Sequence, residues 1–258
     1  MKLSNCSYSY RDLFKGGGMT MEAFLDNSAA LGLDGVELTQ YYFPEETDEF
    51  LNHLKREAHR RGLDVAGAAV GGNFINPDAG ERQKQIEHVK DWLVKAAKLG
   101  APILRVFAGP QPQGVDYETC EDWVQEGLTQ CAVTAAKHGV VLALENHGGV
   151  TATGDGVLSL MEPLVDNPWI GLNLDFGNFT GDVYDQFRRC ARLAVTTHAK
   201  VTCRQGDERR RIDYRKVVHI MREAGYHGYL SIEFEEPAEP LEGVSHFAAY
   251  LRGCIVDA

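Results

Sequence analysis

Short apolar runs alternate with longer amphipathic stretches along the whole chain. The apolar runs are rich in β-branched residues and are bounded by polar turns, a pattern that is typical of β-strands. Several of them, such as the VVLAL run, are apolar almost throughout, as expected for a sheet that is buried on both faces. The eight predicted strands are Lys2–Tyr8, Gly35–Thr39, Asp64–Val70, Pro102–Phe107, Val140–Glu145, Ile170–Asp175, Ala194–Lys200 and Tyr229–Phe234.

The amphipathic stretches between these runs predict helices. The predicted helices are Met21–Leu31, Asp48–Arg61, Glu81–Leu99, Tyr117–His138 and Tyr214–Ala224. The last four of these are each followed by a glycine, the residue that most readily forms a left-handed helix C-cap. The repeated order of helix, glycine and short strand predicts a parallel α/β fold.

Eight strands alternating with helices fit either a closed barrel or a doubly wound open sheet. An open sheet that binds a dinucleotide would have a glycine-rich phosphate turn after its first strand. The glycines at 16–18 do not form a GxGxxG motif and do not open a helix directly after a strand. The 258 residues match the roughly 250 of a (β/α)8 barrel. We therefore predict the α/β class, with a single (β/α)8 TIM barrel domain over residues 1–258.

Charge and composition indicate the class of partner. The chain has 26 Lys and Arg against 37 Asp and Glu, a formal net charge of -11, and 44% of its residues are hydrophobic. An acidic surface repels phosphate backbones and anionic membranes, so we expect a small-molecule partner, with no nucleic acid and no membrane. Tyrosines and apolar residues on the predicted helices would permit a homodimer without requiring one.

The cysteines and the N-terminal segment indicate a cytoplasmic protein. The six cysteines form no CxxC pair and no zinc-finger spacing, which favours reduced structural thiols. The segment MKLSNCSYSYRDLF lacks the apolar core of a signal peptide, and no run of about 18 apolar residues occurs.

Four ionisable residues lie at the C-terminal ends of four successive predicted strands. They are Glu145, Asp175, His198 and Glu233, and they are separated by about one strand–helix unit each. In a (β/α)8 barrel the C-terminal ends of the strands meet at one mouth, where active sites lie. Burying three carboxylates together without a cation is costly, so the pattern predicts one divalent metal ion. Three oxygen ligands and one imidazole favour Mn²⁺, while Mg²⁺, Co²⁺ and Zn²⁺ stay open.

These residues and their surroundings resemble the xylose-isomerase-like barrels, in particular the sugar phosphate isomerase/epimerase family. The resemblance covers nearly the whole chain. The motifs that carry it are GLDGVEL at 32–38, LRVFAG at 104–109, LALENHGG at 142–149, LNLDFGNF at 172–179, THAK at 197–200 and GYHGYLSIEFE at 225–235. LENHGG together with the GYxGYLSIEFE ending is the most specific part.

The resemblance implies that Glu145, Asp175, His198 and Glu233 match the family's metal ligands. It also implies that Glu145 and Glu233 act as acid and base on opposite faces of a bound sugar. This agrees with the chemistry of epimerisation beside a carbonyl, which removes a proton from one face and returns it to the other. The metal would hold the carbonyl and a neighbouring hydroxyl and would stabilise the enediolate oxygen.

Further residues are predicted to bind substrate. His147 and Lys200 each lie two residues beyond a predicted ligand, so they should face the same way if the strands persist. Arg105 is expected either to bind substrate oxygens or to pair with Glu145. Glu37 either binds sugar hydroxyls or orients a neighbouring side chain. The run Arg209–Arg211 is interpreted as a solvated polar loop, with the alternative that it reaches over the mouth to a phosphate or carboxylate.

The chain departs from the family at Asn178. Many relatives have Asp-x-x-His where this chain has Asp175-Phe-Gly-Asn178. Asparagine can hydrogen-bond a sugar hydroxyl but is a poor metal ligand, so the usual substrate-contacting histidine is in doubt. The departure also argues against the related DNA-repair endonucleases, which need further His and Asp ligands and a basic DNA-binding face.

The sequence therefore predicts a metal-dependent isomerase or epimerase that works through a metal-bound enediolate. Its expected substrate is a keto-sugar, a sugar phosphate, a related polyol ketone or a small hydroxy-carbonyl acid. One alternative uses the same site as an inosose- or dehydroshikimate-type dehydratase, because the same enediolate can expel a β-hydroxyl. Another is a non-catalytic sugar-binding barrel, against which the intact set of ligands argues.

Overall fold

Eight parallel strands close into a barrel in the computed structural model, which describes residues 1–205 and 208–257. Their order around the barrel is β1-β10-β7-β6-β5-β4-β3-β2. The pairing of β1 with β10, from Lys2 opposite Tyr229 to Asn5 opposite Ile232, closes the barrel. The strands are β1 Lys2–Cys6, β2 Gly35–Thr39, β3 Asp64–Ala69, β4 Ile103–Phe107, β5 Val141–Glu145, β6 Ile170–Asp175, β7 Ala194–Ala199 and β10 Tyr229–Ile232. The predicted (β/α)8 TIM barrel is confirmed.

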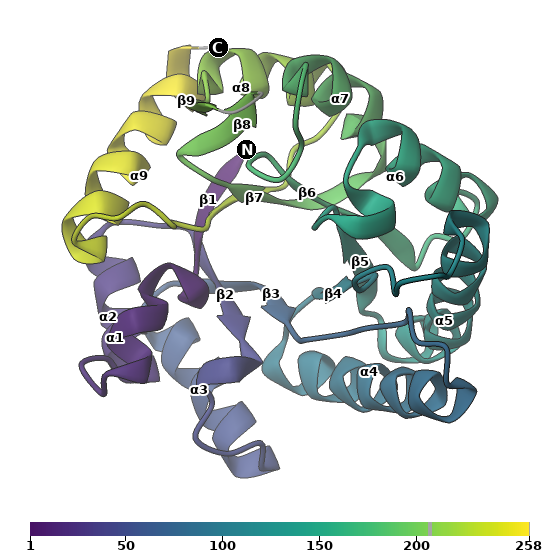
Figure 1. Ribbon diagram of the computed structural model, residues 1–258. Helices are drawn as coiled ribbons and strands as arrows, with labels where there is room; N and C mark the ends of the chain where they lie inside the picture. Colours follow the sequence, from purple (N-terminus) through teal and green to yellow (C-terminus); the bar gives the residue numbers. More distant parts are fainter. Residues whose placement is uncertain (206–207, 258) are drawn as a thin grey trace.

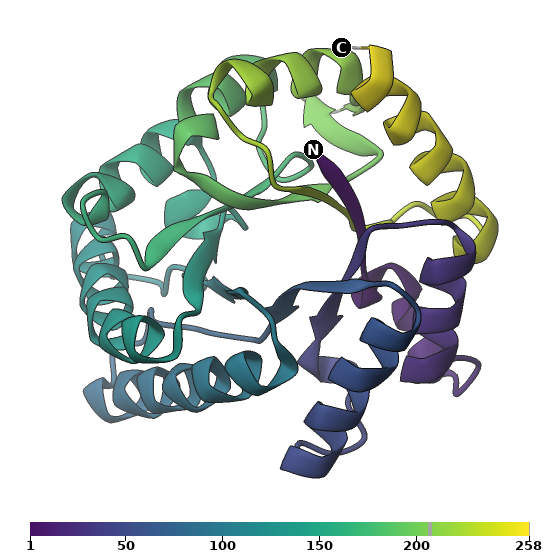
Figure 2. The same ribbon diagram turned by 180° about the vertical axis from the view of Figure 1, so that it is seen from behind.

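Helices surround the barrel as an outer ring (Figures 1 and 2). The α-helices are α1 Arg11–Lys15, α2 Met21–Ala30, α3 Asp48–Arg60, α4 Ala79–Leu99, α5 Tyr117–His138, α6 Gly154–Met161, α7 Val183–Cys190, α8 Tyr214–Glu223 and α9 Pro240–Asp257. Short 3-10 turns follow several strands, including Ser7–Tyr10 after β1 and Gln40–Tyr42 after β2. These two turns carry aromatic side chains to the C-terminal mouth of the barrel.

Local signals in the sequence account for the helix boundaries. Thr47 caps α3 by accepting a hydrogen bond from the Phe50 N–H, and Asp78 caps α4 through Gly80 and Glu81. Because Asp78 is the cap, α4 begins two residues before its predicted start. At the C-terminus of α5, Gly139 adopts φ 68°, a left-handed conformation that costs residues with a Cβ about 1–2 kcal/mol.

The interpretation of Arg209–Arg211 as a polar loop was wrong. These residues belong to strand β9, Glu208–Arg211, which pairs antiparallel with β8, Thr202–Gln205, outside the barrel. Arg209 pairs with Glu236 across 3.2 Å, so its guanidinium is held at the rim of the barrel. Residues 206–207, between the two strands, lie outside the described residues.

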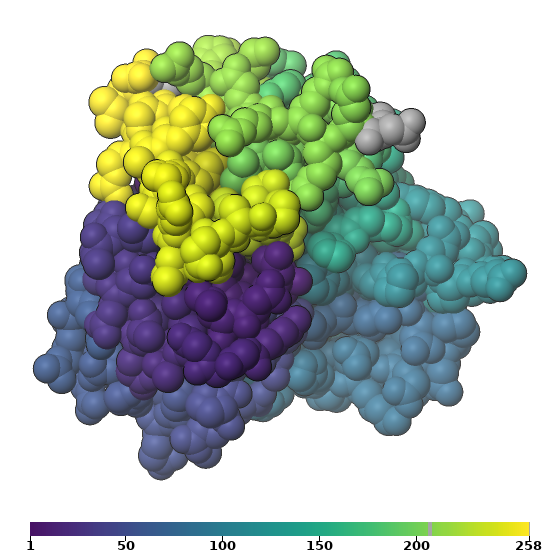
Figure 3. Space-filling view, turned by 60° about the vertical axis from the view of Figure 1, so that its left-hand side comes forward, coloured from purple at the N-terminus to yellow at the C-terminus, as the bar shows by residue number. Residues whose placement is uncertain are grey.

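The core consists of the strand interiors and the inner faces of the helices. All six residues of β6 are buried, and Trp92 on α4 and Phe24 on α2 are fully covered. The C-terminal segment, yellow in Figure 3, lies against the purple N-terminal segment, so both ends of the chain contribute to one wall. Among the described residues, no helix is both long enough and apolar enough to cross a membrane.

Candidate metal and active site

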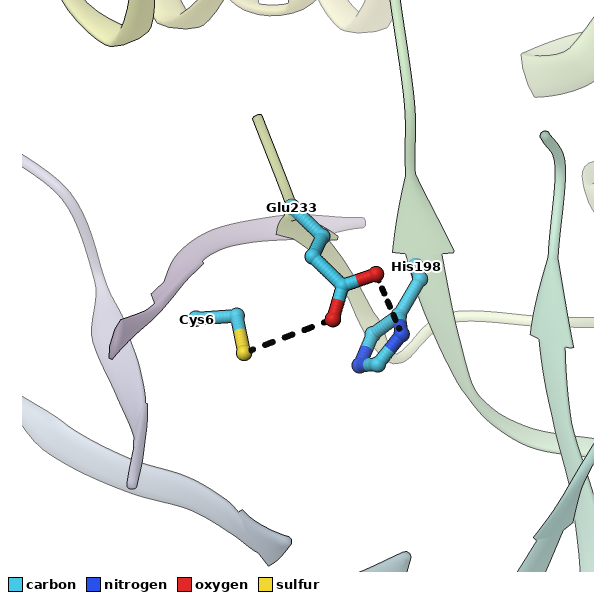
Figure 4. A group of neighbouring side chains, drawn as sticks. All are labelled: Cys6, His198 and Glu233. Atoms are coloured by element: carbon cyan, nitrogen blue, oxygen red, sulfur yellow. Dashed lines mark hydrogen bonds and ion pairs between the residues drawn. The ribbon is translucent and has the colours of Figure 1, made fainter. Parts of the chain in front are cut away.

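The four predicted ligands meet inside the mouth of the barrel. Glu145, Asp175, His198 and Glu233 are buried, and each offers one ligand atom within 4.8 Å of the others. The Nδ1 atom of His198 lies 3.3 Å from Oε2 of Glu233, 3.4 Å from Oε2 of Glu145 and 3.6 Å from Oδ2 of Asp175. Figure 4 shows the imidazole of His198 and the carboxylate of Glu233 turned toward each other.

Strand register explains why these side chains meet. Asp175 on β6 lies opposite His198 on β7, and His198 lies opposite Ser231 on β10. Glu145 on β5 lies opposite Asn173 on β6, two residues before Asp175. Since residues two apart on a strand face the same way, Asn173 and Asp175 both point into the barrel. Parallel strands in this register bring their C-terminal carboxylates to one level.

The donor set fits a divalent cation. The Oδ2 atom of Asp175 and the Nδ1 atom of His198 are buried without a hydrogen-bond partner among the described residues. An unpaired buried carboxylate oxygen and ring nitrogen are costly, and both atoms face the centre of the cluster. Three carboxylate oxygens and one imidazole nitrogen are ligands for Mn²⁺ and related divalent ions. The buried cluster can therefore hold a metal ion.

Glu37 fixes the orientation of His198. Its carboxylate accepts a hydrogen bond from Nε2 of His198, at 2.9 and 3.1 Å to the two oxygens, and another from Oγ of Ser231 at 2.9 Å. Because this hydrogen bond engages Nε2, the Nδ1 atom faces the three carboxylates and is the nitrogen that can bind a cation once it has lost its proton. Glu37 thus lies behind the histidine, on the side away from the ligand cluster.

Glu145 is the carboxyl group most able to carry a proton near neutrality. Burial raises its pKa to about 7, although His198 and Arg105 oppose the rise. The Nε atom of Arg105 lies 3.2 Å from Oε2 of Glu145. The side-chain amides of Asn173 and Asn178 donate to the Glu145 oxygens at 3.1 and 3.3 Å. Of the two roles expected for Arg105, the structure shows the pairing with Glu145.

Glu233 is held in the opposite protonation state. Burial alone would raise its pKa, but the charges of His198 and Lys200 outweigh this and hold the pKa well below its usual range. The Nζ atom of Lys200 lies 2.6 Å from Oε2 of Glu233 and 2.7 Å from Oε2 of Glu235. The two glutamates therefore differ: Glu145 is proton-accepting near neutrality, and Glu233 is a stable carboxylate.

Residues 25–254 match the sequence pattern of the xylose isomerase-like TIM barrel family. The chain belongs to this family. It is 27% identical, over 195 residues, to the C-glycoside deglycosidase alpha subunit of Microbacterium trichothecenolyticum. The match covers 70% of this chain and 50% of that protein, so the chain spans about half the length of this curated relative.

Solved structures of other xylose isomerase-like barrels share the fold over nearly all of the chain. D-psicose 3-epimerase of Clostridium cellulolyticum H10, solved with D-tagatose, superimposes with a TM-score of 0.79 at 18% identity, covering 99% of each chain. The probable 3-DHS dehydratase of Bacillus anthracis superimposes with a TM-score of 0.74 at 18% identity, covering 98% of this chain and 99% of that one. At these identities the likeness establishes the fold alone.

In this xylose isomerase-like barrel the ligand cluster opens into a cavity of about 200 Å³. Its lining residues are Tyr8, Tyr41, Arg105, Phe107, Glu145, His147, Lys200, Glu233 and Glu235. Strand β5 ends at Glu145, so His147 reaches the cavity from the loop beyond it, where its ring packs on Phe107 with centroids 4.5 Å apart. Burial lowers the pKa of His147, which keeps its ring neutral at neutral pH.

Several residues of the site escaped the sequence analysis. Cys6, at the end of β1, places its Sγ 3.9 Å from Oε1 of Glu233 (Figure 4). The same Sγ lies 3.4 Å from Oγ1 of Thr39. Burial raises the pKa of the Cys6 thiol well above its usual value, so it stays protonated and donates. The side chain of Asn146 exchanges two hydrogen bonds with the backbone of Asp175. The two-residue period of the strands points to Asn173 and Ser231, which lie two residues before Asp175 and Glu233, but it does not point to Cys6 or Asn146.

Proposed function

We propose that this protein is a divalent-metal-dependent isomerase or epimerase that moves a proton beside the carbonyl of a sugar. The observation that carries the proposal is the convergence of two buried glutamates, one at the end of β5 and one directly after β10, on one cation-binding cluster. With two carboxyl groups beside the substrate, one can remove a proton and the other can return one within one turnover. The shared fold with a ketose 3-epimerase supports the proposal.

Each side chain has a defined part in the proposed reaction. Glu145 ends β5 and Glu233 directly follows β10, with β6 and β7 between these two strands around the barrel, so the glutamates approach a bound sugar from different sides. One carboxylate removes the proton from the carbon beside the carbonyl, and the other carboxyl returns a proton to the enediolate. Lys200 and Arg105 hold the two carboxylates in place. His147 and Asn178 offer hydrogen bonds to sugar hydroxyls.

Glu145, Asp175, His198 and Glu233 would hold the metal ion. When bound, a divalent cation supplies positive charge that favours the enediolate over the neutral ketone. We favour Mn²⁺ for this mixed set of oxygen and nitrogen donors, with Mg²⁺, Co²⁺ and Zn²⁺ as alternatives.

Proton exchange with solvent tests this function directly. The Mn²⁺-loaded protein is incubated in D₂O with D-fructose, D-psicose, D-tagatose and L-ribulose, and deuterium at the carbon beside the carbonyl is followed by NMR. We expect exchange with at least one ketose. Glu233→Gln should lower the exchange rate by about 10²–10⁴, because the amide cannot accept the proton. Near-normal exchange in Glu233→Gln would remove this residue from the mechanism, and no exchange in any ketose would refute the proposal.

Elimination of water is the second candidate reaction for the same site. The fold is shared with a probable dehydratase, and the same enediolate can expel a β-hydroxyl as water after protonation by the second carboxyl. Incubation with a keto-inositol distinguishes the two reactions, because dehydration produces an enone absorbance and epimerisation does not.

A further inference from the structure

A second and larger cleft lies beside the candidate active site. Its volume is about 770 Å³, and it is formed by the segments that follow β1 and β2 at the mouth of the barrel. The rings of Phe14 and Tyr42 stack with centroids 4.6 Å apart and planes inclined by 13°. The aromatic residues that line this cleft are Tyr8, Phe14, Tyr41, Tyr42, Phe43 and Phe50. We refer to it as the aromatic cleft.

The aromatic cleft adjoins the cavity of the ligand cluster. Tyr8 and Tyr41 line both spaces, and the Tyr41 side chain stands at the boundary with 44% of its surface exposed. The cavity at the cluster, about 200 Å³, is smaller than the roughly 300–1,000 Å³ of pockets that enclose drug-sized ligands. A substrate larger than one sugar ring must therefore extend beyond this cavity, and the larger of the two pockets that share lining residues with it lies past these two tyrosines.

Charge determines what kind of group fits this extension. Arg105 and Lys200, the basic residues that line the inner cavity, are already paired with Glu145, Glu233 and Glu235. A phosphate group there would have to compete with these buried carboxylates. The lining of the aromatic cleft contains one lysine and one glutamate, Lys15 and Glu22, but is otherwise mostly aromatic and apolar. Aromatic side chains favour flat apolar groups and the apolar faces of rings.

We propose that the aromatic cleft binds the aglycone, an aromatic or otherwise apolar non-sugar group, of a glycoside whose sugar ring carries the reacting ketone. The inference deepens the proposed function and rests on it, since the sugar ring is the part that reacts at the ligand cluster. The curated relative is named for a C-glycoside, a sugar joined to such a group, which supports this class of substrate. A keto-glycoside is then expected to bind more tightly than the free ketose that reacts at the same ligand cluster.

Binding of unreactive glycosides tests the subsite separately from catalysis. The dissociation constants of phenyl β-D-glucoside, methyl β-D-glucoside and glucose 6-phosphate are measured by calorimetry with the Mn²⁺-loaded protein. The two glycosides cannot open to a carbonyl form, so their binding is read without turnover, and NMR checks that glucose 6-phosphate is not converted during the measurement. We expect the phenyl glycoside to bind about tenfold more tightly than the methyl glycoside, since one well-placed aromatic contact contributes about that factor. Equal affinities, or tighter binding of glucose 6-phosphate, would overturn the proposal.

A pair of variants locates the effect in the cleft. Phe14→Leu keeps an apolar side chain but removes the ring, so the preference for phenyl over methyl should fall several-fold. Tyr250→Leu removes a ring from α9 that is as exposed as Tyr41, at 44%, and lies outside the cleft, so its preference should equal that of the wild type. An equal loss in both variants would overturn the assignment.

The two proposals can fail separately. A phenyl preference without deuterium exchange would leave the subsite standing and remove the reaction. Deuterium exchange without a phenyl preference would support the reaction and remove the proposed aglycone subsite. The wild-type comparison of the three ligands needs no variant, so the test does not depend on the folding of Phe14→Leu.

Discussion

His198 illustrates how one residue links the ligand cluster to the rest of the barrel. Its Nε2 donates to Glu37, and its Nδ1 faces Glu145, Asp175 and Glu233. Burial alone would lower the pKa of the imidazole, but the carboxylates around it outweigh burial and raise the pKa well above its usual value. In the absence of a metal ion, a proton on Nδ1 offsets part of the negative charge of the three carboxylates. Metal binding must displace that proton.

Removal of the Glu37 carboxylate should weaken metal binding. In Glu37→Gln the neutral amide no longer fixes the tautomer of His198 as a carboxylate does, and loss of such a partner typically costs about 10–100-fold in metal affinity. Calorimetry with Mn²⁺ measures the change. The matched control is Glu223→Gln, which removes a carboxylate from an exposed histidine, His219, at 3.2 Å, and should leave the affinity unchanged. Equal affinities in Glu37→Gln and wild type would contradict the role of Glu37.

Metal affinity should decrease as the pH falls. The folded-state pKa of Glu145 is raised to about 7, so this group is mostly charged at about pH 8 and mostly protonated at about pH 6. Only the charged form is a ligand, so the dissociation constant for Mn²⁺ should increase by up to about tenfold per pH unit below 7 through this group alone. Calorimetry at several pH values, in buffers of different ionisation enthalpy, also counts the protons released. A dissociation constant independent of pH over this range would contradict this pKa.

Sequence reasoning found the four residues that meet in the cluster because each is an ionisable residue at the end of an apolar predicted strand. It could not choose between the two roles offered for Glu37, since the choice depends on the position of β2 relative to β7. Cys6 and Asn146 escaped notice for a different reason. A buried cysteine and an asparagine in a loop carry no pattern of their own, and only their three-dimensional neighbours reveal them.

At the scale of elements, the predicted bounds of β2, β6 and α5 are those of the structure. The short helices α1, α6 and α7 and the longer α9 went unassigned, because their amphipathic patterns are brief or interrupted by glycine. The β8–β9 hairpin was missed since Arg209–Arg211 has no apolar alternation. Its strands pair outside the barrel, where exposed polar side chains carry no penalty.

Two exposed glycines should respond oppositely to a methyl group. A Cβ would meet no atom within 4 Å at either Gly139 or Gly253. Gly139 has φ 68°, so Gly139→Ala should destabilise the fold by about 1 kcal/mol through backbone strain. Gly253 lies within α9 with ordinary helical backbone, so Gly253→Ala should stabilise it by about 0.5–1 kcal/mol. Urea denaturation measures both values, and changes of the same sign would contradict the argument.

At the scale of the whole molecule, metal binding should raise the melting temperature. A ligand that binds only the folded state adds about 2.7 kcal/mol of stability when present at 100 times its dissociation constant. Differential scanning calorimetry with Mn²⁺ and with a chelator should therefore give separate transitions. His198→Ala should abolish the difference because it removes a ligand, and a persistent Mn²⁺-dependent shift in that variant would contradict the assignment of His198.

The hydrogen bond between Glu37 and His198 joins strand β2 to strand β7, which are separated on one side by β1 and β10. Cation affinity thus depends on the shape of the barrel's cross-section as well as on the ligands themselves. A fragment that begins after β2 would retain all four ligands yet lack the carboxylate that aligns the imidazole. Tight binding of a cation therefore indicates that the barrel is completely closed. Damage to β1 or β2 would weaken cation binding even though the four ligands come from other strands.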